Sequence, residues 1–539
     1  MSAYRLRWAR AGVPPAGLLL LAAGLWLGWL AWMRPLTLPD EGRYAGVAWE
    51  MLRSGSHAVP LLDGMPYFHK PPLYYWMAEL CFHLFGLNEW AARMPSWLAA
   101  WAALAGLYGF VRRYRDAACA TAAVVILATM PFYYGAAQFA NTDMLVAGLV
   151  TLAVLAGADA VLRAEAGGRY RLLSVGAAVS AALAILAKGL IGLVLPGAAL
   201  CLWLLFTRRW RGFLVLLWPP AVAAFALVAV PWFWLMQQRF PGFFHYFFVY
   251  QHFERFAQSG FNNVQPFWFY VPVVVGLALP WSLWGGGALR KVFWVGADAF
   301  GLRSLMAIWA AVVLVFFSVP SSKLIGYVLP ALPPLAVLLA EVVQQALRGG
   351  DPERVRRMAW GCGAASAAIC LVLVGVFAAN PRRSAEALGN RIAAEMGPAD
   401  TLVTLHSYPF DLGFYTGARQ PGWVVDDWNN PEIALRDNWR KELYDAGQFR
   451  PQVARRVLVP HGELAARLCA AAPGSRFWVW GGVDDGKRFR ILQGMQAPFA
   501  DAHYRVWRVD VDAAFRQRIC GETPTAGLPG RSAPPGPAE

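Results

Sequence analysis

Long apolar runs alternate with short polar segments along most of this chain. Eleven runs are long enough, at 1.5 Å of rise per residue, to cross the roughly 30 Å hydrocarbon core of a bilayer as helices. Two further short spans would keep both termini on the same sides, so the pattern predicts eleven to thirteen transmembrane helices. The runs lie near residues 14–33, 95–111, 117–135, 144–162, 172–187, 189–206, 213–235, 266–288, 305–320, 324–347 and 358–379.

Basic residues fall in every second loop of this pattern. Cytoplasmic loops of membrane proteins carry an excess of Lys and Arg, so a cytoplasmic N-terminus accounts for the alternation. It places residues 34–94, the loops 136–143 and 236–265, the turn 320–323 and the chain after residue 380 on the external face. The first run has basic flanks but no small-residue cleavage site, which indicates an anchor and not a signal peptide. The basic residues are Arg5, Arg7, Arg10, Arg112, Arg113, Arg115, Arg163, Arg169, Arg171, Arg208, Arg209, Arg211, Arg290, Lys291, Arg303, Arg348, Arg354, Arg356 and Arg357.

Composition agrees with a polytopic protein of a plasma membrane, with a periplasmic or extracellular face. The chain is 58% hydrophobic and 15% charged, outside the range of soluble domains. Its 26 Trp and 18 Tyr fit the aromatic belts at membrane interfaces. The net charge of +15 could point to nucleic acid, but its placement is explained by topology. The sequence shows neither a Gly-rich phosphate loop nor a dinucleotide fingerprint, so we do not expect a soluble nucleotide as co-substrate.

Composition changes near Asn380, where apolar runs shorten to strand length. We therefore expect a transmembrane domain over 1–379, a small external α/β domain over 380–522 and a disordered tail over 523–539. Strands are predicted at 401–405, 456–459, 476–480 and 504–509, with a helix-like aromatic stretch over 408–415.

Seven cysteines are scattered without metal-ligand spacing. Five lie in or near apolar segments and are expected to fill the core. Cys469 and Cys520 share the external domain, where an oxidising compartment permits a disulfide. The sequence leaves a disulfide and two free thiols as equal alternatives. The five apolar cysteines are Cys81, Cys119, Cys201, Cys362 and Cys370.

Charged residues beside the first predicted span suggest a functional site. Asp40 and Glu41 are followed by Arg43 and Tyr44 in a helical pattern that starts at Asp40. Asp40 could simply cap this helix, but two acids and a base beside a bilayer favour a function. Lys70 precedes Pro71-Pro72, which fixes its direction; a snorkelling lysine is the alternative to a phosphate ligand.

Other polar residues fall on the same predicted face. Asp143 starts a span, where helix capping and a site role are equally plausible. Lys188-Gly189 separates two apolar runs, and the aromatic loop 236–265 carries Tyr250 and Arg255. Cations and acids gathered on one face predict anionic lipid headgroups as partners. The turn at 320–323 and the residues after it add Lys323 and Tyr327.

The ordered motifs resemble the bacterial aminoarabinose transferases (ArnT) that modify lipid A, within the protein mannosyltransferase-like glycosyltransferases of the GT-C fold. The resemblance implies sugar transfer from a polyprenyl (undecaprenyl) phosphate donor at the periplasmic face, by an inverting reaction. It assigns the donor phosphate to Lys70, Arg255 and Tyr327, and the essential acid to Asp40. Lys323 is predicted as a fourth phosphate ligand. Glu41 and Asp143 complete the expected catalytic set, and the expected sugar pocket comprises Arg43, Tyr44, Tyr67, His69 and Tyr250. The motifs are D-E-G-R-Y (40–44), Y-F-H-K-P-P-L-Y-Y-W (67–76), N-T-D (141–143), K-G (188–189), V-P-W (230–232), P-W (280–281) and S-K-L-I-G-Y-V-L-P (322–330).

One position departs from this family pattern, because His69 stands where the relatives usually have Glu before the lysine. The sugar could therefore be aminoarabinose, a hexosamine or a neutral hexose. The expected acceptor is lipid A, with a protein or another envelope glycan as the alternative. A lipid-linked sugar flippase and a lipid-binding scaffold are the non-enzymatic alternatives. We expect a monomer that requires no cofactor, with a divalent cation left open.

Overall fold

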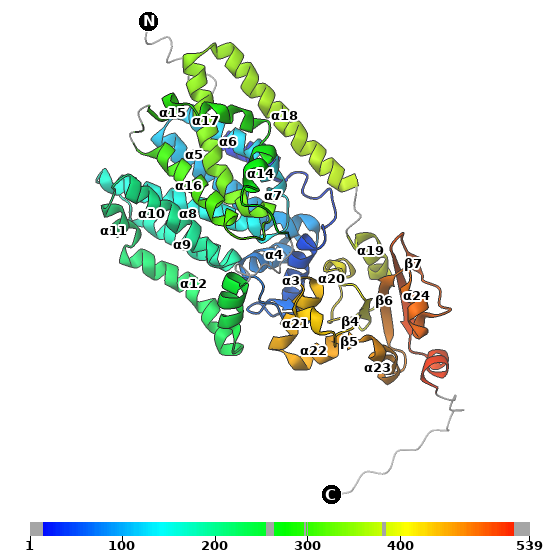
Figure 1. Ribbon diagram of the computed structural model, residues 1–539. Helices are drawn as coiled ribbons and strands as arrows, with labels where there is room; N and C mark the ends of the chain where they lie inside the picture. The colour runs from blue at the N-terminus through cyan, green and yellow to red at the C-terminus, as the bar shows by residue number, and fades with distance from the viewer. Residues whose placement is uncertain (1–13, 255–262, 296–297, 299, 380–383, 522–539) are drawn as a thin grey trace. The chain divides into compact units, whose positions relative to one another are not determined.

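A computed structural model describes residues 14–254, 263–295, 298, 300–379 and 384–521. Contacts divide the chain into two compact units (Figure 1). The first contains Met1–Ser384 together with Pro409–Phe414 and Ala434–Phe449. The sequence assigned those last two segments to the C-terminal domain, but they pack with the first unit. The second unit contains Ala385–Tyr408, Tyr415–Ile433 and Arg450–Glu539.

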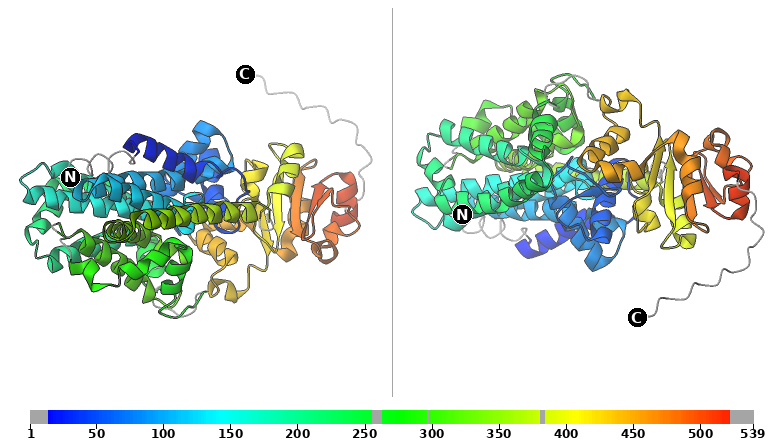
Figure 2. Two further views of the ribbon diagram at one scale, coloured as in Figure 1. Left: turned by 90° about the horizontal axis from the view of Figure 1, so that it is seen from above. Right: turned by 90° about the horizontal axis from the view of Figure 1, so that it is seen from below.

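The first unit is helical, and its long helices lie side by side in both views of Figure 2. Its elements are α2 (Ala16–Gly28), α3 (Asp40–Ser54), the strands β1 (Leu61–Leu62) and β2 (Met65–Pro66), α4 (Leu73–Phe85), α5 (Glu89–Tyr114), α6 (Ala117–Thr129), α7 (Pro131–Ala137), α8 (Thr142–Glu165), α9 (Arg171–Lys188), α10 (Ile191–Phe206), α11 (Arg211–Leu216), α12 (Pro219–Arg239), the π-helix η1 (His245–Glu254), α14 (Tyr270–Leu277), η2 (Trp281–Gly287), α15 (Lys291–Val295), α16 (Leu302–Ser318), η3 (Ile325–Ala331), α17 (Leu332–Gly349), α18 (Pro352–Ala379) and α21 (Trp439–Phe449).

The apolar runs form helices, but only some are long enough to span a membrane alone. Among the described residues, six helices meet the length and hydropathy of a span: α5, α8, α9, α12, η3 with α17, and α18. α6 and α7 form a bent pair, and α2, α10 and α16 are shorter apolar helices. The run at 266–288 breaks into α14 and η2, because Pro280 lacks an N–H and glycines follow. The chain is a multi-pass membrane protein.

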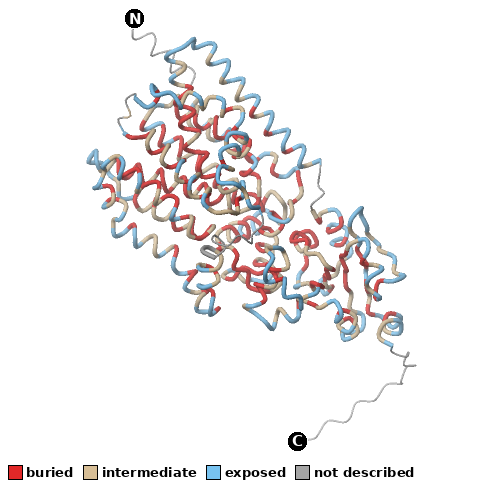
Figure 3. Tube along the Cα trace, in the orientation of Figure 1, coloured by how far each residue is buried: buried red, intermediate tan, exposed pale blue. Residues whose placement is uncertain are grey.

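At the bend between α6 and α7, the backbone groups freed by the break find hydrogen-bond partners within the helix bundle. The two helices meet at 69°. The Thr129 carbonyl accepts hydrogen bonds from Ser366 Oγ, at 2.5 Å, and Cys370 Sγ, at 3.4 Å, both on α18. Trp281 Nε1 donates to the Thr129 hydroxyl at 2.8 Å. Such partners replace the backbone bonds that water cannot supply in a bilayer. Most other residues of α18 are coloured exposed or intermediate in Figure 3.

Two glycines let the segment Pro409–Phe414 pack directly on α3. A Cβ on Gly46 would lie 2.5 Å from the Phe410 carbonyl oxygen, and one on Gly42 would lie 3.0 Å from the Asp411 backbone nitrogen. Both approaches are tighter than side chains tolerate, so the contact requires glycine. Part of the C-terminal region is thereby fixed against the helix that begins at Asp40.

The second unit is an α/β domain built on a six-stranded sheet of order β5-β4-β3-β6-β8-β7. β3 pairs in parallel with β4 and β6, and β4 with β5, whereas β8 is antiparallel to β6 and β7. The predicted strands are present, while the short β4 and β7 were not predicted. Of the aromatic stretch 408–415, only the part within α20 (Leu412–Thr416) is helical. The remaining elements are α19 (Glu386–Glu395), β3 (Thr401–Leu405), β4 (Trp423–Asp426), η4 (Pro431–Ala434), α22 (Pro451–Val457), β5 (Leu458–Pro460), η5 (His461–Glu463), α23 (Leu464–Ala470), β6 (Arg476–Gly482), α24 (Asp485–Arg488), η6 (Arg490–Leu492), β7 (Phe499–Ala500), β8 (Tyr504–Asp510), α25 (Ala513–Phe515) and η7 (Arg516–Cys520).

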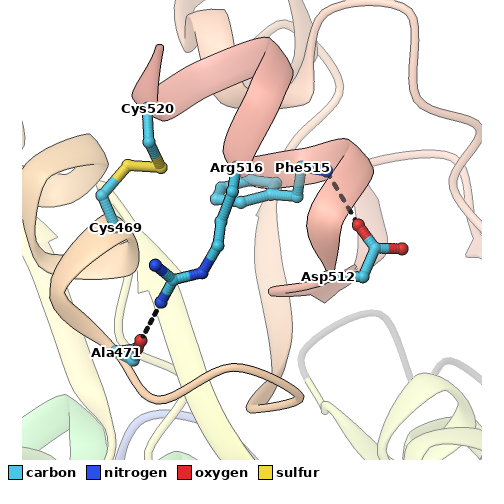
Figure 4. Close-up of a disulfide and its surroundings, with 6 residues drawn as sticks. All are labelled: Cys469, Ala471, Asp512, Phe515, Arg516 and Cys520. Carbon is cyan, nitrogen blue, oxygen red and sulfur yellow. Dashed lines mark hydrogen bonds between the residues drawn. A yellow bond between two sulfur atoms is a disulfide. The ribbon is translucent and has the colours of Figure 1, made fainter. Parts of the chain in front are cut away.

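A disulfide joins Cys469 on α23 to Cys520 on η7, which settles the alternative that the sequence left open (Figure 4). Arg516 Nη2 donates to the Ala471 carbonyl oxygen at 2.7 Å beside it. Both cysteines pack against the buried core of the sheet, which includes Phe515. The bond therefore fastens the end of the domain to its core. The predicted tail, 523–539, lies outside the described residues.

Candidate active site

Asp40 is the first residue of α3, and its side chain does not cap the helix. The N-cap position is Pro39, without a side-chain cap. The Asp40 carboxylate is 55% exposed and its Oδ1 lies 2.9 Å from Arg43 Nη1. Capping, the structural alternative for Asp40, is therefore wrong, and more than half of the side chain is accessible to solvent.

Asp143 lies in an ion pair with Lys188. Asn141, not Asp143, caps α8, because its side chain accepts the Asp143 N–H at 2.9 Å. Lys188 ends α9 and its Nζ bonds to Asp143 Oδ1; the same Nζ lies 4.8 Å from the centre of the Tyr327 ring. The backbone at Gly326 approaches Asp143 so closely that a Cβ would overlap its carboxylate. Three helix ends thus converge on one acid.

Lys188 connects this group to the beginning of α3. It interacts electrostatically with both Asp40 and Lys70. Lys70 is half-buried and precedes two buried prolines. Lys188 is thus ion-paired with Asp143 and lies within the electrostatic influence of Asp40 and Lys70. The K-G motif drew attention to Lys188, but its role was not predicted from the sequence.

A second group of polar residues adjoins the first through Arg43. Arg43 Nη2 lies 2.7 Å from Glu442 Oε1 on α21. Tyr67 is fully buried and its hydroxyl donates to Glu442 Oε2 at 2.7 Å. Burial raises the pKa of Tyr67, and the Glu442 carboxylate raises it further, so the phenol stays protonated. Both oxygens of Glu442 are thus held by predicted pocket residues.

His69 lies beside the next acid of α21. Its Nε2 is 3.9 Å from Asp445 Oδ2, and its ring stacks on Tyr67 with centroids 4.8 Å apart. Lys441 Nζ donates to Asp445 Oδ1 at 3.0 Å, and the Tyr246 hydroxyl lies 3.3 Å from Oδ2. Burial raises the pKa of Asp445, opposed by Lys441. A carboxylate therefore stands near position 69, although the sequence has histidine there.

Tyr250 and Tyr44 line this second group. Tyr250 stacks on Tyr246 at 5.7 Å, and Lys441 Nζ lies 5.1 Å from the centre of its ring. Tyr44 is buried on α3, with its ring 5.5 Å from that of Tyr74. Tyr250 therefore contacts α21, whereas Tyr44 packs between α3 and α4. Sequence reasoning missed Lys441, Glu442 and Asp445, since they lie in a segment assigned to another domain.

Glu41, a predicted catalytic residue, is fully buried among arginines. Its carboxylate bonds to Arg34 and to Arg93, whose Nε lies 2.8 Å from Oε1. The backbone N–H groups of Thr37 and Ala140 donate to the same carboxylate at 3.0 and 2.8 Å. Burial alone would raise the pKa of Glu41, but the two arginines outweigh it and hold that pKa well below its usual range. This arrangement is that of a structural ion pair.

Lys323, a predicted phosphate ligand, bonds to backbone carbonyls instead. Lys323 is 4% exposed, and its Nζ donates to the backbone carbonyls of Pro320 and Gln265, the latter at 2.9 Å. It ties together two loops. Arg255 lies outside the described residues. Among the residues that the structure does describe, three or more His, Cys, Asp or Glu side chains are nowhere arranged to hold a metal ion.

The sequence of this chain is similar to that of known glycosyltransferases. The family described as "Dolichyl-phosphate-mannose-protein mannosyltransferase" matches residues 69–234. Curated relatives called undecaprenyl phosphate-alpha-4-amino-4-deoxy-L-arabinose arabinosyl transferase include one from Enterobacter sp. (strain 638), 31% identical over 63% of this chain and 61% of its own. Another, from Pseudomonas aeruginosa (strain UCBPP-PA14), is 33% identical over 63% of this chain and 61% of its own. This chain is similar in sequence to the aminoarabinose transferases.

Solved structures extend the similarity to the fold. The structure of ArnT from Cupriavidus metallidurans bound to undecaprenyl phosphate superposes with a TM-score of 0.76 at 23% identity, over 92% of this chain and 98% of that one. An archaeal oligosaccharyltransferase, AglB from Archaeoglobus fulgidus, superposes with a TM-score of 0.52 at 12% identity. The fold is therefore of the GT-C type, and the resemblance to aminoarabinose transferases seen in the motifs is confirmed. The chain spans about three fifths of the length of the curated relatives that it matches.

Proposed function

We propose that the chain is a glycosyltransferase of the bacterial inner membrane, which moves 4-amino-4-deoxy-L-arabinose from undecaprenyl phosphate to a phosphate of lipid A on the periplasmic face. One observation carries the proposal: the exposed Asp40 carboxylate lies in electrostatic reach of Lys188, which also interacts with Lys70. An acid beside two ammonium groups suits a substrate with a sugar at one end and a phosphate at the other.

Lys70 and Lys188 have the chemistry to stabilise the departing phosphate. Transfer breaks the bond between the anomeric carbon and the donor phosphate oxygen, and undecaprenyl phosphate leaves with the electron pair. Negative charge therefore grows on that oxygen, where nearby cations lower the barrier most. Tyr327 holds Lys188 through its ring at 4.8 Å, and Asp143 orients the ammonium group. Arg255 is a further proposed phosphate ligand.

The acceptor determines the role of Asp40. A lipid A phosphate is already anionic at neutral pH, so its oxygen attacks the anomeric carbon without loss of a proton. Asp40 then stabilises positive charge that develops at that carbon. Attack opposite the leaving phosphate inverts the configuration. A hydroxyl acceptor would instead require Asp40 to remove the proton as general base.

The acids of α21 support an amino sugar. Glu442 and Asp445 lie beside Tyr67 and His69, and a carboxylate in a buried pocket is a natural partner for a sugar ammonium group. Asp445 places a carboxylate beside position 69, where the relatives usually have Glu. Within this proposal Glu41 serves as a structural ion pair and Lys323 as a link between loops.

Product analysis tests the function directly. The full chain, purified into lipid nanodiscs, is incubated with undecaprenyl phosphate 4-amino-4-deoxy-L-arabinose and lipid A, and products are read by mass spectrometry. We expect lipid A to gain one pentosamine per modified phosphate. Transfer only to a protein or to another glycan would replace the proposed acceptor. A parallel assay uses the same protein in sealed vesicles. Movement of the donor across their membrane without any transfer in either assay would support a flippase and overturn the proposal.

A further inference from the structure

The carboxylate of Glu50 joins two elements of the candidate site. Glu50 lies near the C-terminal end of α3, which begins at Asp40, and is 6% exposed. Its Oε2 accepts the Asp63 backbone N–H at 2.7 Å, and its Oε1 accepts the Gly64 N–H. Arg53 Nη2 lies 3.3 Å from Oε1. The acid therefore binds two consecutive backbone donors.

Those donors form the turn of the hairpin between β1 and β2. Asp63 and Gly64 both have positive φ, at 50° and 77°, as a two-residue turn matched to twisted strands requires. The flanking pairs are Leu61 with Pro66 and Leu62 with Met65. The two turn N–H groups point out of this ladder, and an ionised carboxylate binds such donors more strongly than a neutral acceptor. Glu50 therefore fastens the hairpin turn to α3.

The hairpin leads directly into the predicted donor-binding residues. The Tyr67 N–H donates to the Pro60 carbonyl oxygen at 2.8 Å and extends the ladder by one bond. Lys70 follows three residues later, before Pro71-Pro72. The position of the hairpin along α3 consequently sets where Tyr67 and Lys70 stand relative to Asp40.

We propose that Glu50 is a positioning residue, which holds the hairpin on α3 and thereby fixes the spacing between Asp40 and Lys70. This inference rests on the proposed function, because the spacing matters for a donor that has its sugar at the acid and its phosphate at the lysine. Glu50 itself does not touch the substrate in this account.

The protonation of Glu50 gives this role a measurable signature. Burial raises the pKa of Glu50 to about 7; Asp63 adds to the rise and Arg53 opposes it. Asp63 acts on Glu50 from the hairpin, and Arg53 acts on it from α3. Because the folded pKa exceeds the ordinary 4.5, the contribution of Glu50 to folding stability falls as pH rises from 4.5 to 7. In the folded protein the carboxylate ionises as pH rises through about 7, and the ionised form binds the turn more strongly, so donor affinity should rise there.

The test compares Glu50→Gln with a matched control, Glu79→Gln, in full-length protein in nanodiscs. Glu79 is another buried acid of the same region, but it pairs with the exposed side chain of His57. Hydrogen exchange of residues 61–66, the Kd for undecaprenyl phosphate, and kcat and KM for the sugar donor are measured from pH 5.5 to 8.5. Glu50→Asp, with a shorter carboxylate, serves as a second variant if the amide fails to fold.

We expect Glu50→Gln to speed exchange of the hairpin amides about tenfold and to raise the Kd and KM about tenfold. Its kcat should change less. The pH dependence of Kd near 7 should fall to that of Glu79→Gln, which retains only the titration of the ligand phosphate itself. Exchange and Kd equal to those of Glu79→Gln would overturn the inference. A wild type that binds undecaprenyl phosphate but transfers no sugar would refute the proposed function alone, since exchange and Kd still decide the role of Glu50.

Discussion

Arg43 Nη2 and Glu442 Oε1 lie 2.7 Å apart although 399 positions separate them in the chain. The pair brings a C-terminal helix to the helix that begins at Asp40. Arg43 also binds Asp40 at 2.9 Å, so one guanidinium connects the exposed acid to the buried acid of α21. The two polar groups of the site are linked through this side chain.

Glu442→Gln should reduce selection for an amino sugar. The neutral glutamine side chain has only one acceptor oxygen for Arg43 and Tyr67. It also lacks the negative charge that would pair with a sugar ammonium group. We expect kcat/KM to fall at least about tenfold with the amino-sugar donor, a loss of ~1.4 kcal/mol, and less with its neutral 4-hydroxy analogue. Kinetics with both donors check this. Equal losses with the two donors would assign Glu442 a structural role only.

Lys70 and Lys323 should differ sharply, although the sequence predicted phosphate binding for both. Lys70→Met removes an ammonium group from the cluster of Lys188 and Asp40, and we expect KM for the donor to rise about tenfold or more. Lys323→Met removes bonds to two backbone carbonyls, so we expect a lower Tm with KM nearly unchanged. Donor titrations and thermal unfolding of both variants measure the contrast. If KM rose similarly in Lys70→Met and Lys323→Met, Lys323 would be a phosphate ligand as the sequence predicted.

Glu41→Gln should destabilise the first unit, because it leaves Arg34 and Arg93 buried without their carboxylate. Breaking a buried ion pair from one side costs about 3–5 kcal/mol. The folded pKa of Glu41 is depressed below the ordinary 4.5, so its stabilising effect is present above pH 4.5 and is lost as pH falls below that value. Thermal unfolding in detergent between pH 3 and 7 tests this. On acidification, the Tm of the wild type should fall more than that of Glu41→Gln. An equal or smaller fall would contradict the role of Glu41 as a structural ion pair.

Loss of the Cys469–Cys520 disulfide should weaken the second unit without removing the chemistry. The bond closes a separation of 51 residues, and such a cross-link contributes about 2–4 kcal/mol. We expect the Cys469→Ser/Cys520→Ser double variant to become more sensitive to protease within residues 450–521 and to keep near-normal transfer activity at low temperature. Protease protection equal to that of wild type would show that the bond adds little.

The sequence predicted the elements of the site better than their assembly. The start of α3 at Asp40 and the break after Lys188 follow from local composition, because charges and glycines interrupt apolar runs there. The role of α21 could not be predicted, since an amphipathic helix does not reveal which surface it packs on. The buried ion pairs of Glu41 could not be predicted for a similar reason: its two arginines come from elsewhere, one of them 52 positions away on α5. The break at Pro280 divides a run whose hydropathy alone predicts one span.

The transfer rate of Asp40→Asn tests the central claim most directly. The substitution keeps the shape of the side chain and removes its charge, so binding of undecaprenyl phosphate should persist within about threefold. We expect single-turnover transfer to lipid A, followed by mass spectrometry, to slow at least about 100-fold, or ~2.7 kcal/mol. Glu89→Gln, an acid in the first turn of α5, serves as the control. A rate for Asp40→Asn within twofold of the control would contradict the account.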